Sequence, residues 1–166
     1  MGAPIVFVMG SDSDLPNLEG AFSSLRELEV AFEVRVISAH RTPKEAAEFA
    51  ENARDNGHRC ILAAAGLAAH LAGVLAAHTS LPVLGIPMPG GALAGVDALY
   101  STVQMPGGVP VATFGIGKAG AKNAALFAVR MLANDDSSIL ARLDAWIEAQ
   151  GDIVRGKDAE VRKQYS

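Results

Sequence analysis

The sequence predicts an α/β fold with a five-stranded parallel sheet, and three observations support this. Short apolar runs of strand length recur along the chain, at residues 4–9, 32–37, 60–64, 82–86 and 111–114. Segments with helical spacing of apolar residues separate these runs, which is the pattern of βαβ units. Right-handed crossovers favour the strand order 2-1-3-4-5, a three-layer flavodoxin-like arrangement with flanking helices. The whole chain, 1–166, suits a single domain with one sizeable core.

The first two strands and the helix between them are delimited by their flanking residues. Residues 4–9 (PIVFVM) form a continuous apolar run, as expected of a strand that is buried on both faces. Residues 11–14 (SDSD) are of helix-capping types and predict a helix over 15–28. Residues 32–37 predict a second strand, also buried, which ends before Ser38.

Proline and glycine delimit most of the remaining helices. Pro43 fits the first turn of a helix that extends to about Asn56, with Gly57 as its stop. Further helices are predicted over 68–78, over 96–104, after the glycines at 115, 117 and 120 to about 134, and over 137–150. The charged segment 151–166 completes a C-terminal helical tail, and we expect it either to fray or to pack on a neighbouring subunit.

Composition excludes several classes of function. The net charge is -4 and no basic stripe is present, which argues against a nucleic-acid partner. Cys60 is the sole cysteine and opens an apolar run, so we expect a buried structural thiol. Neither a targeting segment nor an apolar stretch of about 20 residues is present, which predicts a cytoplasmic protein without a membrane partner. The high content of apolar and small residues predicts helical surface buried between subunits.

Three polar loops follow predicted strands and are the best candidates for a site. They comprise residues 10–14 (GSDSD), 38–43 (SAHRTP) and 66–70 (GLAAH). In open parallel sheets, ligands bind outside the carboxyl ends of the strands, close to the point where the strand order reverses. That point lies here between the first and third strands, so the fold would bring the three loops together.

The loops carry residues suited to binding a phosphorylated sugar, although each also has a purely structural interpretation. Ser11 and Ser13 open a helix, where they could hold an anion or only cap the helix. Asp14 could bind a sugar diol or only complement the helix dipole. Arg41 is a forked donor suited to phosphate, with Ser38 as a further hydroxyl, but alone it resembles an exposed surface cation.

Histidine is the one residue type here that exchanges a proton near neutral pH. His40 lies between Ser38 and Arg41, so we interpret it as catalytic, although an isolated histidine is more often structural. His70 would be buried in a helix or directed at the cavity, whereas His58 and His78 look like surface or helix-end residues. The glycines from Gly115 to Gly120 resemble a dinucleotide fingerprint only weakly, because the required βαβ context is absent.

Five motifs together resemble the class I members, the N5-carboxyaminoimidazole ribonucleotide mutases, of the purine-biosynthesis aminoimidazole ribonucleotide carboxylase family. They are MGSDSDLP (9–16), VISAHRTP (36–43), AGLAAHLAG (65–73), VQMPGGVPVAT (103–113) and IGKAGAKNAAL (116–126). The resemblance implies an octamer that converts N5-carboxyaminoimidazole ribonucleotide into 4-carboxy-5-aminoimidazole ribonucleotide. It implies no metal, biotin or nucleotide cofactor.

The same resemblance implies roles for individual residues. Substrate contacts map onto Ser11, Asp14 and Arg41, and the general acid and base maps onto His40, flanked by Ser38 and Ala39. The loop with Gly66, His70 and Leu71 would close over the imidazole ring and the carboxylate. The chain departs from the family pattern at Ala64, Leu67, Ala72 and the segment 88–91 (MPGG). These departures bear on loop geometry and turnover, and Leu67 matters most because a glycine there permits close backbone approach to the ligand.

Three alternatives remain open at the level of sequence. The first is class II chemistry on the same fold, the direct carboxylation of aminoimidazole ribonucleotide with carbon dioxide; the intact SAHRTP and AAHLAG motifs favour class I. The second is a non-catalytic flavodoxin-like module that binds a nucleotide or flavin, which the scarcity of aromatic residues near the loops disfavours. The third, suggested only by Leu67, is an inactive structural paralogue.

Overall fold

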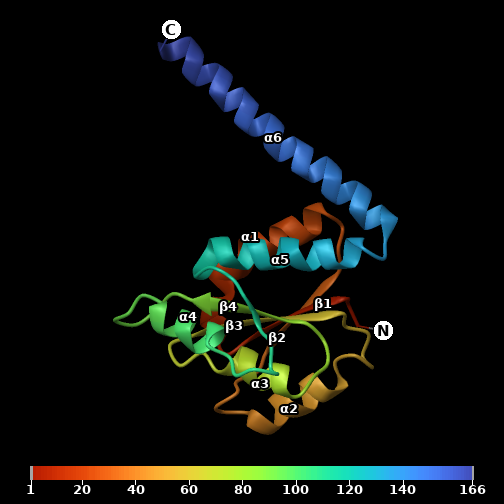
Figure 1. Ribbon diagram of the computed structural model, residues 1–166, viewed down its shortest axis with the longest axis vertical. Helices are drawn as coiled ribbons and strands as arrows, with labels where there is room; N and C mark the ends of the chain where they lie inside the picture. The colour runs from red at the N-terminus through yellow and green to blue at the C-terminus, as the bar shows by residue number, and fades with distance from the viewer. Residues whose placement is uncertain (1, 166) are drawn as a thin grey trace.

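A computed structural model describes residues 2–165 and contains one five-stranded, all-parallel sheet (Figure 1). Its strands are β1 (Ile5–Met9), β2 (Phe32–Val36), β3 (Cys60–Gly66), β4 (Val83–Met88) and β5 (Ala112–Thr113). The spatial order is β2-β1-β3-β4-β5, which confirms the predicted order 2-1-3-4-5. Parallel pairing brings the carboxyl ends of all five strands to one edge of the sheet, where the polar loops begin.

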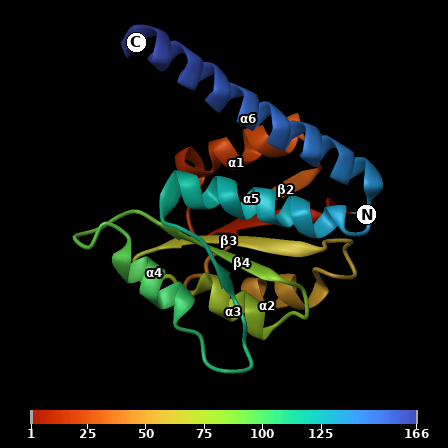
Figure 2. The same cartoon turned by 45° about the horizontal axis from the view of Figure 1, so that its top comes forward.

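Helices cover both faces of the sheet, so the molecule has three layers (Figure 2). The helices are α1 (Leu15–Glu27), α2 (Pro43–Asn52), α3 (Leu71–Ala77), α4 (Val96–Val103), α5 (Gly117–Ala133) and α6 (Ser137–Tyr165), with a 3₁₀ turn, η1 (Asp12–Asp14), before α1. α1 and α5 pack side by side on one face, and α2, α3 and α4 lie on the other. None of the helices within residues 2–165 combines the length and the apolar composition that a membrane span requires.

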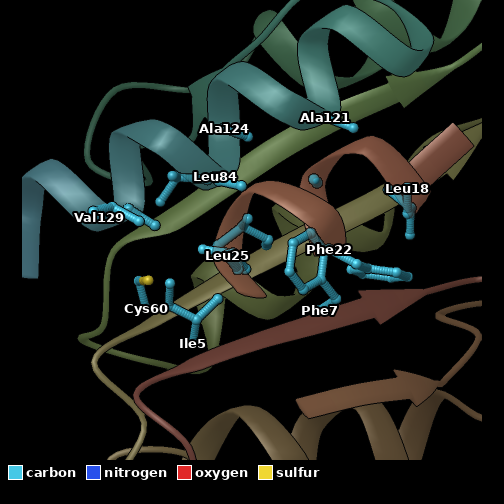
Figure 3. Close-up of a cluster of buried hydrophobic side chains, with 14 of the residues drawn as sticks. Ile5, Phe7, Leu18, Phe22, Leu25, Cys60, Leu84, Ala121, Ala124 and Val129 are labelled. Atoms are coloured by element: carbon cyan, nitrogen blue, oxygen red, sulfur yellow. The ribbon is translucent and has the colours of Figure 1, made fainter. Parts of the chain in front are cut away.

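Alternating side chains of β1 divide the core into two layers. Ile5, Phe7 and Met9 pack with α1 and α5, as Figure 3 shows for Ile5 and Phe7. Val6 and Val8 point to the opposite face, toward α2 and α3. All five side chains are fully buried, which explains why this strand is apolar throughout rather than alternating.

The prediction that residues 32–37 form a buried strand is wrong in one respect. β2 lies at the edge of the sheet, and three of its five residues are exposed, including Val36 at 57%. The apolar residues of β1 indicate a strand that is buried on both faces, but those of β2 do not. Only Ile37, which follows β2 and donates a backbone hydrogen bond to the carbonyl of Met9 (2.9 Å), is buried.

The C-terminal segment is helical throughout, and it extends beyond the expected end of the helix near residue 150. α6 continues without a break to Tyr165 and projects away from the sheet (Figure 1). The two predicted segments, 137–150 and 151–166, thus belong to one continuous helix within the described residues. Of the whole helix, only Leu143 is buried, so little of α6 packs on its own subunit.

Two residues near the start of β3 belong to the core. His58, expected at the surface, is buried, and its Nδ1 lies 2.6 Å from the carbonyl oxygen of Ala3. The loop after α2 folds back against the N-terminal segment and buries His58. A position close to the end of a helix therefore did not predict that this side chain is buried. Cys60 is buried as predicted, and burial raises the pKa of its thiol to about 12, so it remains an unreactive structural thiol at neutral pH.

Candidate active site

A cavity of about 370 Å³ lies at the carboxyl edge of the sheet. Residues from all three predicted loops line it, and they include each of the nine candidate residues: Ser11, Asp14, Ser38, Ala39, His40, Arg41, Gly66, His70 and Leu71. The loops follow β1, β2 and β3, which are neighbours in the sheet. The parallel topology therefore joins segments that are about 30 residues apart in sequence.

The first loop is fixed by the hydroxyl group of Ser11. Its Oγ accepts hydrogen bonds from the backbone nitrogen of Ser13 (3.3 Å) and from the Oγ of Ser13 (2.9 Å), which caps η1. Asp14 occupies the N-cap position of α1, but its carboxylate makes no capping hydrogen bond. This carboxylate therefore remains available at the cavity wall, whereas Ser11 has a structural role in addition to any contact with a ligand.

Partial burial of Asp14 raises the pKa of its carboxyl group above the ordinary value of 3.8. The folded state then holds the proton more tightly than the unfolded state, so stability falls as pH rises from 3.8 through the raised pKa. We expect Asp14→Asn to remove this loss and to be slightly more stable than the wild type at pH 7. Urea unfolding of both proteins at pH 3.5 and pH 7 measures the effect. A variant that is less stable than the wild type at pH 7 would contradict this assignment.

The second loop is a compact turn built around Ser38. The backbone nitrogen and the Oγ1 of Thr42 both donate to the carbonyl of Ser38, at 2.8 and 3.0 Å. The Ser38 Oγ accepts from the backbone nitrogen of Arg41 (3.2 Å). His40 is exposed at the top of this turn, and within residues 2–165 the guanidinium group of Arg41 has no hydrogen-bond or ion-pair partner. Arg41 is thus free to bind an anion.

The two candidate histidines contact each other across the cavity. The Nε2 of His40 lies 2.9 Å from the Nδ1 of His70, and the two rings are nearly perpendicular (87°). His70 was expected either to be buried in a helix or to be directed at the cavity. It immediately precedes α3 and lines the cavity, so the second position is the one found. A hydrogen bond between these nitrogens needs one hydrogen, so one ring donates and the other accepts. The contact therefore links the second and third loops at the cavity.

A fourth loop, outside the residues that the sequence predicts for the site, completes the cavity. Pro89, Gly90 and Gly91 follow β4 directly and line the wall beside the third loop. The sequence signal was present, because proline and two glycines immediately after a buried strand mark a loop at the same edge of the sheet. In the sequence, the segment 88–91 stands out only as a departure from the family pattern.

The glycines before and within α5 have a structural function. Gly117 has a positive φ of 72°, and Gly120 packs so closely on Gly115 that an added Cβ would lie 1.5 Å from its carbonyl oxygen. This close packing is within the chain, and none of these glycines lines the cavity. In the part of the chain that the structure describes, no three His, Cys, Asp or Glu side chains come together as metal ligands do.

Comparisons with known proteins agree with one another. A family profile described as AIR carboxylase matches residues 4–152. The chain is 52% identical over 152 residues to the N5-carboxyaminoimidazole ribonucleotide mutase of Haemophilus influenzae, covering 92% of this chain and 93% of that protein. It is 51% identical over 152 residues to the protein of the same name from Escherichia coli K12, covering 92% and 90% of the two chains. The mutase of Mycobacterium tuberculosis H37Rv is 50% identical over 156 residues, with 94% and 88% covered.

Solved structures share the fold. The crystal structure of Treponema denticola PurE superposes with a TM-score of 0.83 at 25% identity, covering 94% of this chain and 96% of that chain. The structure titled Treponema denticola PurE2-S38D gives a TM-score of 0.86 at 24% identity, with 96% and 98% covered. At this level of identity the second likeness concerns the fold alone.

Proposed function

Because the chain belongs to the AIR carboxylase family, we propose that its cavity converts N5-carboxyaminoimidazole ribonucleotide into 4-carboxy-5-aminoimidazole ribonucleotide in de novo purine biosynthesis. Relatives that are about 50% identical over more than 90% of the chain bear the name of this mutase, an isomerase. These names favour neither direct carboxylation nor a non-catalytic nucleotide-binding module. The observation that carries the proposal is the contact between His40 and His70 in a cavity that also contains Arg41 and Asp14.

His40 serves first as an acid and then as a base. The substrate is a carbamate, which loses carbon dioxide once N5 is protonated, and His40 as the imidazolium supplies that proton. The bond between N5 and the carboxyl carbon breaks, and its electron pair remains on nitrogen. C4 of the electron-rich ring then attacks carbon dioxide, and the neutral imidazole removes the C4 proton. The histidine ends as it began, so the reaction is a net isomerisation without a cofactor.

The other residues bind the ribonucleotide and orient its ring. We assign Arg41 to the phosphate and Asp14 to the ribose hydroxyls, with Ser11 and Ser38 as further polar contacts. The loop of Gly66, His70 and Leu71 covers the ring and the migrating carboxylate, and Ala39 lies beside it in the turn of His40. Contacts remote from the reacting atoms hold the ring in position, which makes recombination with carbon dioxide effectively intramolecular.

Arg41→Ala is expected to weaken substrate binding more than it slows the chemical step. Loss of a charge-assisted contact to phosphate corresponds to an increase in KM of about tenfold or more, with a smaller change in kcat. Lys44→Ala is a matched control, because Lys44 is an exposed cation three positions further along the chain that does not line the cavity. Steady-state kinetics of both variants measure the effect. An unchanged KM in the Arg41 variant would refute the assignment of this residue.

The proposed reaction is tested by offering both candidate substrates to the purified protein. We expect conversion of N5-carboxyaminoimidazole ribonucleotide without added bicarbonate, and little product from aminoimidazole ribonucleotide with bicarbonate. Direct carboxylation at comparable efficiency would contradict the mutase assignment. Ligand binding without turnover of either substrate would indicate a binding module or an inactive paralogue.

We further propose that residues 1–166 form one catalytic domain of a cytoplasmic homo-octamer, in which the tail from 151 packs on a neighbouring subunit. The octamer follows from the family resemblance, and exposed apolar surface supports association. Leu140, Ile147, Val154 and Val161 recur every seven residues along α6, and each is more than 40% exposed. Light scattering of the purified chain tests this proposal, and a monomer would contradict it.

A further inference from the structure

Leu67 has a backbone conformation that leucine rarely adopts. Its φ is +56°, in the left-handed region, where the side chain of an L-amino acid crowds the backbone. Its side chain is also apolar and 56% exposed. The conformation is held by the loop, because the backbone nitrogen of Ala69 donates to the carbonyl of Leu67 (2.9 Å). The third loop thus presents an exposed apolar side chain from a strained backbone position.

The side chain of Leu67 fills a space that Gly91 leaves empty. A Cβ added to Gly91 would lie 2.7 Å from the Cδ2 of Leu67, closer than such contacts occur. Gly91 also has a positive φ, +60°. The two residues come from the loops after β3 and β4, which are adjacent strands. Leu67 therefore bridges these two loops, and a Cβ at position 91 would displace the end of its side chain.

The bridge lies on the side of the cavity away from the loop that carries Arg41. Arg41 follows β2 and Asp14 follows β1, whereas Leu67 and Gly91 follow β3 and β4, further along the sheet. His70 belongs to the same loop as Leu67 and lies 2.9 Å from the Nε2 of His40. Leu67 and Gly91 thus line the same cavity as the histidine pair, where the proposed carboxyl transfer would take place.

We propose that Leu67, packed against Gly91, covers the reacting end of the cavity and retains carbon dioxide between its release from N5 and its capture by C4. This inference rests on the proposed mutase function. Carbon dioxide is small and carries no net charge, so an apolar cover holds it without a hydrogen bond and excludes water from the reacting atoms. Leu67 would then set the ratio of transfer to escape, because only carbon dioxide that stays can form the C4–C bond.

The test follows the labelled carboxyl group. N5-carboxyaminoimidazole ribonucleotide with a ¹³C carboxyl group is converted in unlabelled bicarbonate, and the label lost from the product is measured together with free aminoimidazole ribonucleotide. We expect Leu67→Gly and Leu67→Ala to increase the escaping fraction about fivefold, because the apolar contact is lost. Alanine removes the part of the side chain that covers the cavity but keeps a Cβ, so the backbone gains none of the conformational freedom that glycine would give it. The alanine variant therefore tests the loss of the apolar side chain by itself. Leu67→Met should retain the label as the wild type does.

Gly91→Ala provides a second route to the same effect. Its Cβ would displace the Leu67 side chain, so this variant should also lose label. The double variant Leu67→Gly with Gly91→Ala should lose no more than Leu67→Gly alone, because both changes disturb one contact. Glu29→Gly is the matched control, since Glu29 also has a positive φ (53°), follows Leu28, the C-cap of α1, and does not line the cavity. It should retain the label.

Distinct outcomes separate this inference from the proposed function. If the wild type makes no product from the labelled substrate, the mutase function itself is refuted. If the wild type is active and Leu67→Gly and Leu67→Ala lose no more label than it does, the cover is refuted and the mutase function stands. If Glu29→Gly lost as much label as Leu67→Gly, the proposed role of Leu67 would also be refuted. Relief of backbone strain at a residue that does not line the cavity would then have the same effect as removal of the Leu67 side chain.

Discussion

The His40→Asn protein is expected to fold and bind the ribonucleotide but to lose carboxyl transfer, with kcat lower by about three orders of magnitude. Asparagine preserves much of the shape of the imidazole and can still hydrogen-bond, but it cannot give up and regain a proton near neutral pH. Since His40 is exposed on a turn held by Ser38 and Thr42, its loss leaves that turn intact. Both decarboxylation and recombination should fail, because the same group serves both steps.

His78→Asn is the matched control for this variant. His78 is also exposed, and it ends α3, where its Nδ1 lies 3.1 Å from a carboxylate oxygen of Glu51, outside the cavity. An exposed pair of this kind contributes little to stability, so near wild-type turnover is expected. Turnover and binding of the product by calorimetry distinguish the two proteins. Near wild-type kcat in His40→Asn would refute the role of His40 as acid and base.

Gly120→Ala should produce the largest loss of stability, lowering the free energy of unfolding by about 3 kcal/mol or more. The new Cβ would lie 1.5 Å from the carbonyl oxygen of Gly115 and 3.0 Å from its Cα, so the backbone itself must move. Movement at this point shifts the start of α5, whose alanines pack against α1 in the core (Figure 3). The added methyl group therefore costs far more in packing than alanine gains in helix propensity.

Gly20→Ala tests the same substitution where space is open. Gly20 lies in the exposed middle of α1, and an added Cβ meets nothing within 4 Å. Alanine should therefore raise the free energy of unfolding by about 0.5–1 kcal/mol, the difference in helix propensity. Urea unfolding of both variants compares the two outcomes. A Gly120→Ala protein as stable as the wild type would show that Gly115 and Gly120 do not pack as described.

Apolar runs predicted the strands well where burial was complete. β1 and β4 are buried at every position, and their runs in the sequence agree with the structure within one or two residues at each end. The runs also predicted β2, but not its place at an exposed edge, because edge strands can carry the same branched residues as central ones. Helix ends were less accurate: α2 stops at Asn52 and not near Asn56.

Local patterns also failed where the partner of a residue is distant in the sequence. His58 binds the carbonyl of Ala3, a contact across 55 positions that no periodicity reveals. The helical tail was predicted, but its continuity with the helix that begins at Ser137 was not, because the apolar spacing of that helix fades near residue 150. The Leu67 contact with Gly91 was equally hidden, since each residue was considered only within its own loop.

The sequence alone determined the fold class, the strand order and the three loops with their candidate residues, because each depends on local spacing and on the handedness of βαβ crossovers. It also carried the motifs that relate the chain to its family. Only the tertiary structure decided which nitrogens of His40 and His70 meet, that the loop of residues 89–91 closes the cavity, and that Leu67 lies over Gly91. These are contacts between loops, and their distances depend on how neighbouring strands twist and how their side chains pack, which a linear pattern does not contain.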